Sequence, residues 1–286
     1  MGWRNAIVRI GAAIATVLTV CCCGTDPAPS AAPPPGLSVS LQQWRSDVPV
    51  HRLQVAVRND TATPVFFQDV RLVSGSFQEM PAQPVNSTLG RTPRTDLPIP
   101  YGAARCDPRR IPPVKPAVVL ARLRVAGGPL HEVMFAIPHP DPLLGQLLRT
   151  ECGEFMLRQS IQVAFGDTWT RTGGRLTGGI RILRKGGTAP VTVEDIGGTT
   201  HYDLKPASGE RRPVAVIPGP STTWEIPVVV TPSRCDPHAM GEAKQAFLFP
   251  VWASVGGAQT YRVIVVPDEP SQRLFQSFAT AACGLT

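Results

Sequence analysis

The sequence predicts an all-β protein of two tandem β-sandwich domains, each with a short C-terminal helix and one internal disulfide. Three observations lead to this prediction. Apolar residues alternate with polar ones in many segments, which is typical of half-buried strands. The 286 residues include 31 Pro and 26 Gly and only 17% charged residues, which disfavours long exposed helices. One cysteine-containing pattern occurs twice, and a chain of this length can bury two cores.

The repeated pattern indicates duplication of one unit. Arg105–Pro108 (Arg-Cys-Asp-Pro) recurs unchanged as Arg234–Pro237, and the pair Cys152-Gly153 recurs as Cys283-Gly284. Further correspondences lie between and before these, in the same order. We expect the first sandwich at residues 37–154 and the second at residues 155–286, joined with almost no linker.

The strands of each unit are identified by alternation. Apolar residues occupy every second position from Leu53 to Val57, and the same spacing covers 119–125 and 261–265. Gly127-Gly128, between two such runs, predicts a hairpin turn, because glycine adopts the positive φ that tight turns require. Residues 226–230 read as an edge strand, because a proline at the second position cannot donate to a ladder.

A helix is expected at the end of each unit. Asp141-Pro142 precedes leucines that fall on one helical face, and Glu269-Pro270 precedes a similar apolar set. An acid followed by proline favours helix initiation, because proline tolerates the first turn and the acid meets its unpaired N–H groups. Each helix is predicted to end at the second cysteine, where glycine follows. Units of about 120 residues with this pattern are broadly immunoglobulin-like in size and layering.

The cysteines divide into three near the N-terminus and four in the repeats. Four cysteines allow three connectivities, and the duplication selects one bond within each repeat. We therefore expect Cys106 to pair with Cys152, and Cys235 with Cys283. Such bonds are typical of exported proteins, which meet an oxidising environment.

Residues 1–20 have the layout of a secretory signal peptide. Arg4 and Arg9 supply a basic start, and an uncharged apolar run follows from Ile10. The run is shorter than the roughly 20 residues of a membrane-spanning helix. Two alternatives to a lipid anchor stay open at this point: a secreted protein released after cleavage, and an uncleaved N-terminal anchor.

The segment Leu18–Cys21 resembles the bacterial lipoprotein signal, in which a leucine three places before a cysteine marks the thiol that is lipidated. Cys22 and Cys23 are the alternative sites of acylation, for example by palmitate. Residues 21–36 then form the lipidated cysteine and a Pro/Ala-rich tether, which behaves as an extended spacer. With its Arg-, Ala-, Pro- and Gly-rich composition, the chain resembles uncharacterised exported lipoproteins of high-GC Gram-positive (actinobacterial) type, which implies the extracytoplasmic face of the cell membrane.

Candidate site residues gather in the second repeat. His238 and Glu242 are spaced i and i+4, which suits a metal on a helical turn, but a surface hydrogen bond is the commoner use of such a pair. His201 and Asp203 offer an acid/base pair. No phosphate-binding glycine loop, Gly-x-Ser-x-Gly elbow or His-Glu-x-x-His motif accompanies them. The sequence therefore predicts no catalytic residues, no cofactor and no metal, with these four side chains as possible binding residues.

The predicted function is a non-enzymatic, membrane-tethered binding or scaffolding module of the cell envelope. Its functional surface is expected where the two sandwiches meet or on their loops. The formal charge of +7 suits an anionic envelope polymer, and another envelope protein is the other possible partner besides the membrane itself. Nucleic acid is not expected, because no exposed aromatics interleave the basic clusters. The alternatives are an envelope hydrolase or other enzyme near His201, Asp203 and His238, and, more weakly, a metal carrier.

Overall fold

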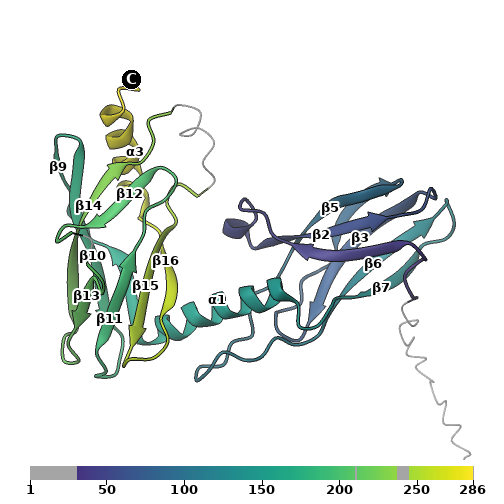
Figure 1. Ribbon diagram of the computed structural model, residues 1–286, viewed down its shortest axis with the longest axis horizontal. Helices are drawn as coiled ribbons and strands as arrows, with labels where there is room; N and C mark the ends of the chain where they lie inside the picture. Colours follow the sequence, from purple (N-terminus) through teal and green to yellow (C-terminus); the bar gives the residue numbers. More distant parts are fainter. Residues whose placement is uncertain (1–30, 210, 237–244, 286) are drawn as a thin grey trace, which may run out of the picture.

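The computed structural model describes residues 31–209, 211–236 and 245–285 and shows two β-sandwich domains joined by a helix (Figure 1). This confirms the expected fold class. All strand pairs within the named sheets are antiparallel. No helix in the described part of the chain combines the length and the apolarity needed to cross a membrane.

Domain 1 consists of a three-stranded and a four-stranded sheet. The first has the order β1 (Leu37–Gln42), β2 (Arg52–Asn59), β5 (Thr92–Pro100); the second has the order β4 (Gln83–Leu89), β3 (Val65–Ser74), β6 (Ala117–Val125), β7 (His131–Ala136). A short 3-10 turn, η1 (Val48–Val50), lies between β1 and β2. The alternation predicted for β2 is visible in Leu53, Val55 and Val57, which are fully buried in the core.

Domain 2 has a five-stranded and a four-stranded sheet. The first has the order β12 (Tyr202–Pro206), β14 (Thr223–Pro232), β10 (Arg175–Arg184), β8 (Ile161–Phe165), with β9 (Thr170–Thr172) on β10; the second has the order β13 (Ala215–Ile217), β11 (Val191–Ile196), β15 (Phe249–Val255), β16 (Tyr261–Val265). β14 lies between β12 and β10, so the expectation that residues 226–230 form an edge strand is wrong. Pro227 is tolerated because its missing donor faces the side of β12, which has ended at Pro206.

The two domains share one topology, as the sequence repeat indicates. In chain order β1, β2, β3, β4, β5, β6 and β7 correspond in sheet position to β8, β10, β11, β13, β14, β15 and β16. Strands β9 and β12 have no counterpart among the named strands of domain 1. β12 belongs to a longer connection between β11 and β13, residues 197–214, which we call the insertion. The corresponding connection in domain 1 spans residues 75–82.

Helix α1 (Pro142–Ser160) begins as predicted but ends later than predicted. The Asp141 side chain accepts a hydrogen bond from the backbone N–H of Leu144 at 2.8 Å, which caps the first turn. The helix continues through Cys152 and Gly153 for seven further residues, so the expectation that it ends at this pair is wrong. Its first part contributes leucines and Cys152 to the domain 1 core, and Leu157 belongs to the domain 2 core.

Helix α3 (Glu269–Ala282) ends as predicted, but it begins one residue earlier, so that Asp268 and not Glu269 is its capping acid. The Asp268 side chain accepts from the N–H of Ser271 at 3.0 Å, which caps the first turn. The Ser271 side chain, and then this N–H, lower the pKa of the Asp268 carboxyl by hydrogen bonding. The helix ends at Cys283, and Gly284 has a φ of 65°, the left-handed conformation that often terminates helices. The same Cys-Gly pair therefore ends one helix and lies inside the other.

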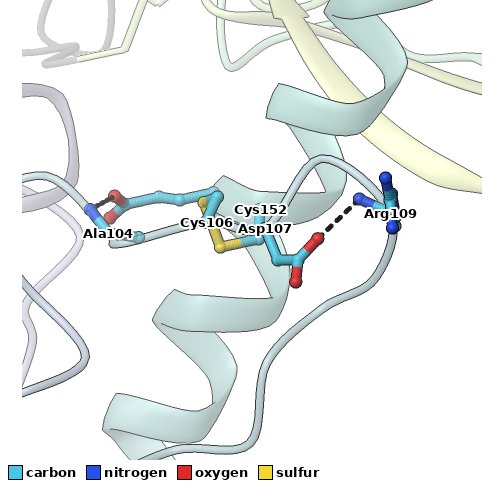
Figure 2. The surroundings of a disulfide bond; sticks show 6 residues. Ala104, Cys106, Asp107, Arg109 and Cys152 are labelled. Atoms are coloured by element: carbon cyan, nitrogen blue, oxygen red, sulfur yellow. Dashed lines mark hydrogen bonds between the residues drawn. A yellow bond between two sulfur atoms is a disulfide. The ribbon is translucent and has the colours of Figure 1, made fainter.

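The two expected disulfides are present. Cys106 is joined to Cys152 and Cys235 to Cys283, across sequence separations of 46 and 48 residues. Figure 2 shows the first bond between α1 and the loop that carries Cys106, where Asp107 accepts the N–H of Arg109. One residue before Cys152, Glu151 accepts the N–H of Ala104 at 2.9 Å, so two links hold the loop to α1.

Candidate functional site

The last turns of α1 pack directly on the edge of domain 2, which fixes the junction between the domains. A Cβ atom on Gly153 would lie 2.4 Å from Cδ1 of Tyr261, the first residue of β16, so only glycine allows this approach. Arg158 donates to the backbone oxygen of Ile264 in β16 at 3.0 Å and to Glu154 at 2.7 Å. Helix and strand are therefore joined by close packing and by hydrogen bonds.

A second link crosses the junction near η1. The side-chain amide of Gln245 in domain 2 donates to the backbone oxygen of Arg45 in domain 1 at 2.6 Å. The segment around Arg45 is anchored from within domain 1 by Asp47, whose side chain is only 2% exposed. Asp47 accepts hydrogen bonds from the N–H of Trp44, the guanidinium of Arg52 and the amide of Gln54. The domain 1 side of the junction is thus a fixed surface.

Between these two links lies a cavity of about 330 Å³, which we call the junction cavity. Its walls come from η1 and Arg45 in domain 1, and from the insertion, β15 with the segment before it, and β16 in domain 2. The lining residues are Arg45, Val48, Gly198, Thr199, Thr200, Gln245, Leu248, Pro250, Arg262 and Ile264. None of them is acidic, and two are arginines with exposed side chains.

A tight turn in the insertion supplies one wall of this cavity. A Cβ atom on Gly198 would lie 2.3 Å from the backbone oxygen of Tyr202, so the turn requires glycine there. The N–H of Thr199 donates to that same oxygen at 2.7 Å, and its hydroxyl donates to the backbone oxygen of Ala246 at 2.8 Å. The turn is therefore held to the chain that precedes β15, and its position does not depend on a ligand.

Of the four predicted binding residues, the structure describes two, both in the insertion. His201 is 6% exposed, and its ring packs edge to face on Tyr202 with ring centroids 5.9 Å apart. The backbone N–H of His201 donates to the Thr199 hydroxyl. His201 lines neither the junction cavity nor the cavity described next. His238 and Glu242 lie outside the described residues, as do Cys21, Cys22 and Cys23 of the predicted lipidation site.

Asp203 is exposed and lines a second cavity of about 640 Å³, formed almost entirely by the insertion. Its lining carries both signs of charge, and its members are Asp195, Ile196, Gly198, Asp203, Leu204, Lys205, Pro206, Arg211, Arg212 and Val214. Asp195 and Arg212 form an ion pair at 2.5 Å. His201 and Asp203 thus differ in environment: one is part of the packed turn, and the other faces a charged cavity.

Two buried tyrosines have raised pKa values. Burial raises the pKa of Tyr202 to about 12. Burial, and then the neighbouring Glu151, raise the pKa of Tyr101. Both hydroxyls therefore keep their protons at neutral pH. In the described ranges, no three His, Cys, Asp or Glu side chains come together as a metal site would need.

Several arginines of the two basic clusters of the sequence, within residues 91–115 and 181–185, are engaged in internal contacts. Arg94 pairs with Asp96 and stacks on Trp44, and Arg181 pairs with Asp167. Arg184 donates to three backbone oxygens, and Arg105 to one. These contacts engage part of the positive charge of both clusters.

Comparisons with known proteins give no family. No family description matches the chain, and no curated protein matches it. Among solved structures, red sea bream transglutaminase has a TM-score of 0.25 and 11% identity over 82% of this chain and 31% of that one. The exo-β-D-glucosaminidase CsxA, from a complex with castanospermine and australine analogues, has a TM-score of 0.21 and 12% identity over 80% of this chain and 26% of that one. The chain thus spans less than a third of either protein.

Proposed function

We propose that this protein is a non-enzymatic binding module of the cell envelope, tethered to the membrane by a lipid on one of Cys21, Cys22 or Cys23. The observation that carries the proposal is the junction cavity, whose walls come from both domains and are fixed by α1 and by the Gln245–Arg45 hydrogen bond. Clefts between domains are favoured places for ligand binding. The cavity lining contains no nucleophile with an adjacent base, which favours binding over catalysis.

The course of the chain fits a tether on the side away from this cavity. Ala31 pairs with β7, donating to the oxygen of Glu132 and accepting from the N–H of Met134. The chain then passes the β2–β3 loop, where Gly36 accepts from Asp60, before β1 runs toward η1. Figure 1 shows the start of the described chain at the end of domain 1 opposite domain 2. A membrane-attached chain would therefore present the junction outward.

A sedimentation experiment tests the proposal. The purified full chain is mixed with isolated cell envelope and centrifuged, and we expect it to move into the pellet fraction. Thr200→Trp, which fills the cavity from an exposed position, should reduce this retention several-fold. Thr172→Trp is the matched control, because Thr172 is exposed on β9 and lines neither cavity.

Two outcomes would contradict the proposal. One is retention that is the same for the wild type and Thr200→Trp, because binding would then lie elsewhere. The other is turnover of an envelope-derived substrate that is abolished by His201→Ala while the circular dichroism spectrum is unchanged. That second result would establish the enzymatic alternative.

A further inference from the structure

The junction cavity carries positive charge without internal compensation. Arg45 and Arg262 line it, and neither has an acidic partner among the residues that the structure describes. Many arginines of this protein are paired, such as Arg52 with Asp47 and Arg158 with Glu154. No carboxylate of the described residues lines the cavity, so the described lining brings two cationic residues and no counter-charge.

The second cavity, which we call the insertion cavity, differs because carboxylates stand beside its three cations, Lys205, Arg211 and Arg212. Its lining includes two aspartates, and Arg212 there is paired with Asp195. An anion entering it would meet carboxylate repulsion, whereas an anion in the junction cavity would meet none from the lining. The two cavities share only Gly198, which belongs to the turn between them.

A neutral donor adds to the two cations. The Thr200 side chain is exposed at the rim, and its hydroxyl forms no hydrogen bond with another described residue. Its backbone is fixed, because its carbonyl oxygen accepts from the Ser233 hydroxyl at 2.7 Å. The hydroxyl of the neighbouring Thr199 is already engaged with Ala246. The cavity therefore offers two guanidinium groups and one hydroxyl as donors.

We infer that the junction cavity binds an oxyanion, a carboxylate or a phosphate group, through Arg45 and Arg262, with Thr200 as a hydrogen-bond donor. The planar fork of N–H groups in arginine matches the geometry of both anions and gives charge-assisted hydrogen bonds. A volume of about 330 Å³ is at the lower end for ligand sites, so it suits one anionic group with a short attached segment. This inference rests on the proposed function and names the chemistry of its ligand.

The position of the two arginines has a further consequence. Arg45 precedes η1 in domain 1, and Arg262 lies in β16 of domain 2, so one anion in contact with both would bridge the domains. A ligand that binds only the native junction stabilises it by mass action. The anionic group of a lipid in the same membrane is the less suitable source, because the tether is proposed to enter domain 1 at the opposite end.

The test is isothermal titration of the purified full chain at about 50 mM salt, where screening of exposed charges is modest. The probes are pentaglutamate for carboxylate, tripolyphosphate for phosphate, and maltopentaose as a neutral compound. We expect at least one anionic probe to bind and maltopentaose not to bind. The stronger of the two anions identifies the source as a carboxylate or a phosphate polymer.

Two double variants distinguish anion binding at the junction cavity from nonspecific attraction of anions to a positively charged protein. Arg45→Gln with Arg262→Gln should weaken anion binding at least about tenfold, because it removes two charge-assisted contacts. Arg91→Gln with Arg175→Gln is the matched control: it also takes one exposed arginine from each domain, and neither residue lines the cavity. We expect this control to change the affinity less than twofold.

The inference is overturned if neither anion binds, or if the control loses as much affinity as the junction variant. Sedimentation of the same proteins with cell envelope shows separately whether the proposed binding function holds. Wild-type retention that the junction variant keeps would refute the oxyanion site and leave the binding module standing. Anion binding by a chain that does not sediment with envelope would refute the module and leave the site.

Discussion

Gly153 of α1 offers the sharpest test of the domain junction, because two opposing effects act on its replacement by alanine. In the interior of an exposed helix, Gly→Ala stabilises by about 1 kcal/mol, since alanine restricts the unfolded chain and favours helix. At Gly153 the new Cβ would lie 2.4 Å from Cδ1 and 3.0 Å from Cγ of Tyr261. Because the contact includes Cγ, the ring can avoid the methyl group only by changing its χ1 rotamer or by moving the strand.

The cost of the contact should exceed the gain in helix propensity. Overpacking of a well-packed site costs about 1–3 kcal/mol. Set against a gain of about 1 kcal/mol, the expected net effect of Gly153→Ala is a loss of about 0–2 kcal/mol in the free energy of unfolding. The substitution should weaken the packing of α1 on β16. The two domains should therefore separate at a lower urea concentration than the one at which their cores unfold.

A matched control lies two turns earlier in the same helix. Gly145 is also buried, but a Cβ there would meet only the end of the flexible Arg149 side chain, at 3.3 Å. Gly145→Ala should therefore stabilise by about 0.5–1 kcal/mol. A third variant, Tyr261→Ala, removes the ring, and Gly153→Ala in that background should change sign and become stabilising.

Urea unfolding followed by tryptophan fluorescence measures all three differences, and small-angle scattering reports whether the domains separate. The reasoning is refuted if Gly153→Ala stabilises the wild-type chain as much as Gly145→Ala does. It is also refuted if Tyr261→Ala leaves the effect of Gly153→Ala unchanged, because the ring would then not be the obstacle.

Three further predictions concern the disulfides, a buried tyrosine and the N-terminus. Replacing Cys235 and Cys283 by alanine should cost about 4 kcal/mol through the lost closure of a 48-residue separation. Replacing Cys106 and Cys152 should cost more, because Cys152 is fully buried in the core; equal losses in urea unfolding would contradict this. Because burial raises the pKa of Tyr202 to about 12, its contribution to stability is complete below pH 10 and is lost as the pH rises toward 12. Tyr202→Phe should flatten this alkaline decline in unfolding free energy, and an unchanged slope would speak against it. Metabolic labelling with a fatty-acid probe should mark the wild type and not the Cys21→Ser, Cys22→Ser, Cys23→Ser triple variant; label in the triple variant would end the lipoprotein hypothesis.

The duplication made much of the fold predictable. A strand, a hairpin glycine or a cysteine that occurs at the same place in both copies is predicted twice, independently. The pairing of Cys106 with Cys152 follows in this way from the position of both cysteines within the repeat. The insertion escaped prediction because it has no counterpart in domain 1, so the comparison of repeats carries no information on it. The wrong prediction of an edge strand at residues 226–230 has the same origin, since β12 of the insertion pairs with β14 on the side that would otherwise be its edge.

The end of α1 shows where a local signal is overridden. Cys-Gly terminates α3 because Gly284 takes a positive φ, whereas Gly153 stays helical because the domain 2 surface packs against it. A sequence signal for continuation did exist: Glu154 and Arg158 are spaced i and i+4 and form an ion pair on the helix. The junction cavity had no such signal. Arg45 and Arg262 belong to different repeats, and only the folded junction brings them to one cavity.

Helix α1 also determines how the two domains share their stability. Leu144, Leu147 and Leu148 belong to the core of domain 1, and Leu157, three turns later, belongs to the core of domain 2. When domain 2 unfolds, the last turns of α1 lose the surface on which they pack. Because the first turns of the same helix belong to the core of domain 1, the free energy of unfolding of domain 1 should then fall. The chain therefore should not melt as two independent bodies. For two independent transitions the calorimetric enthalpy of unfolding would be well above the van't Hoff enthalpy. We expect the two enthalpies of the whole chain to be closer to each other than that.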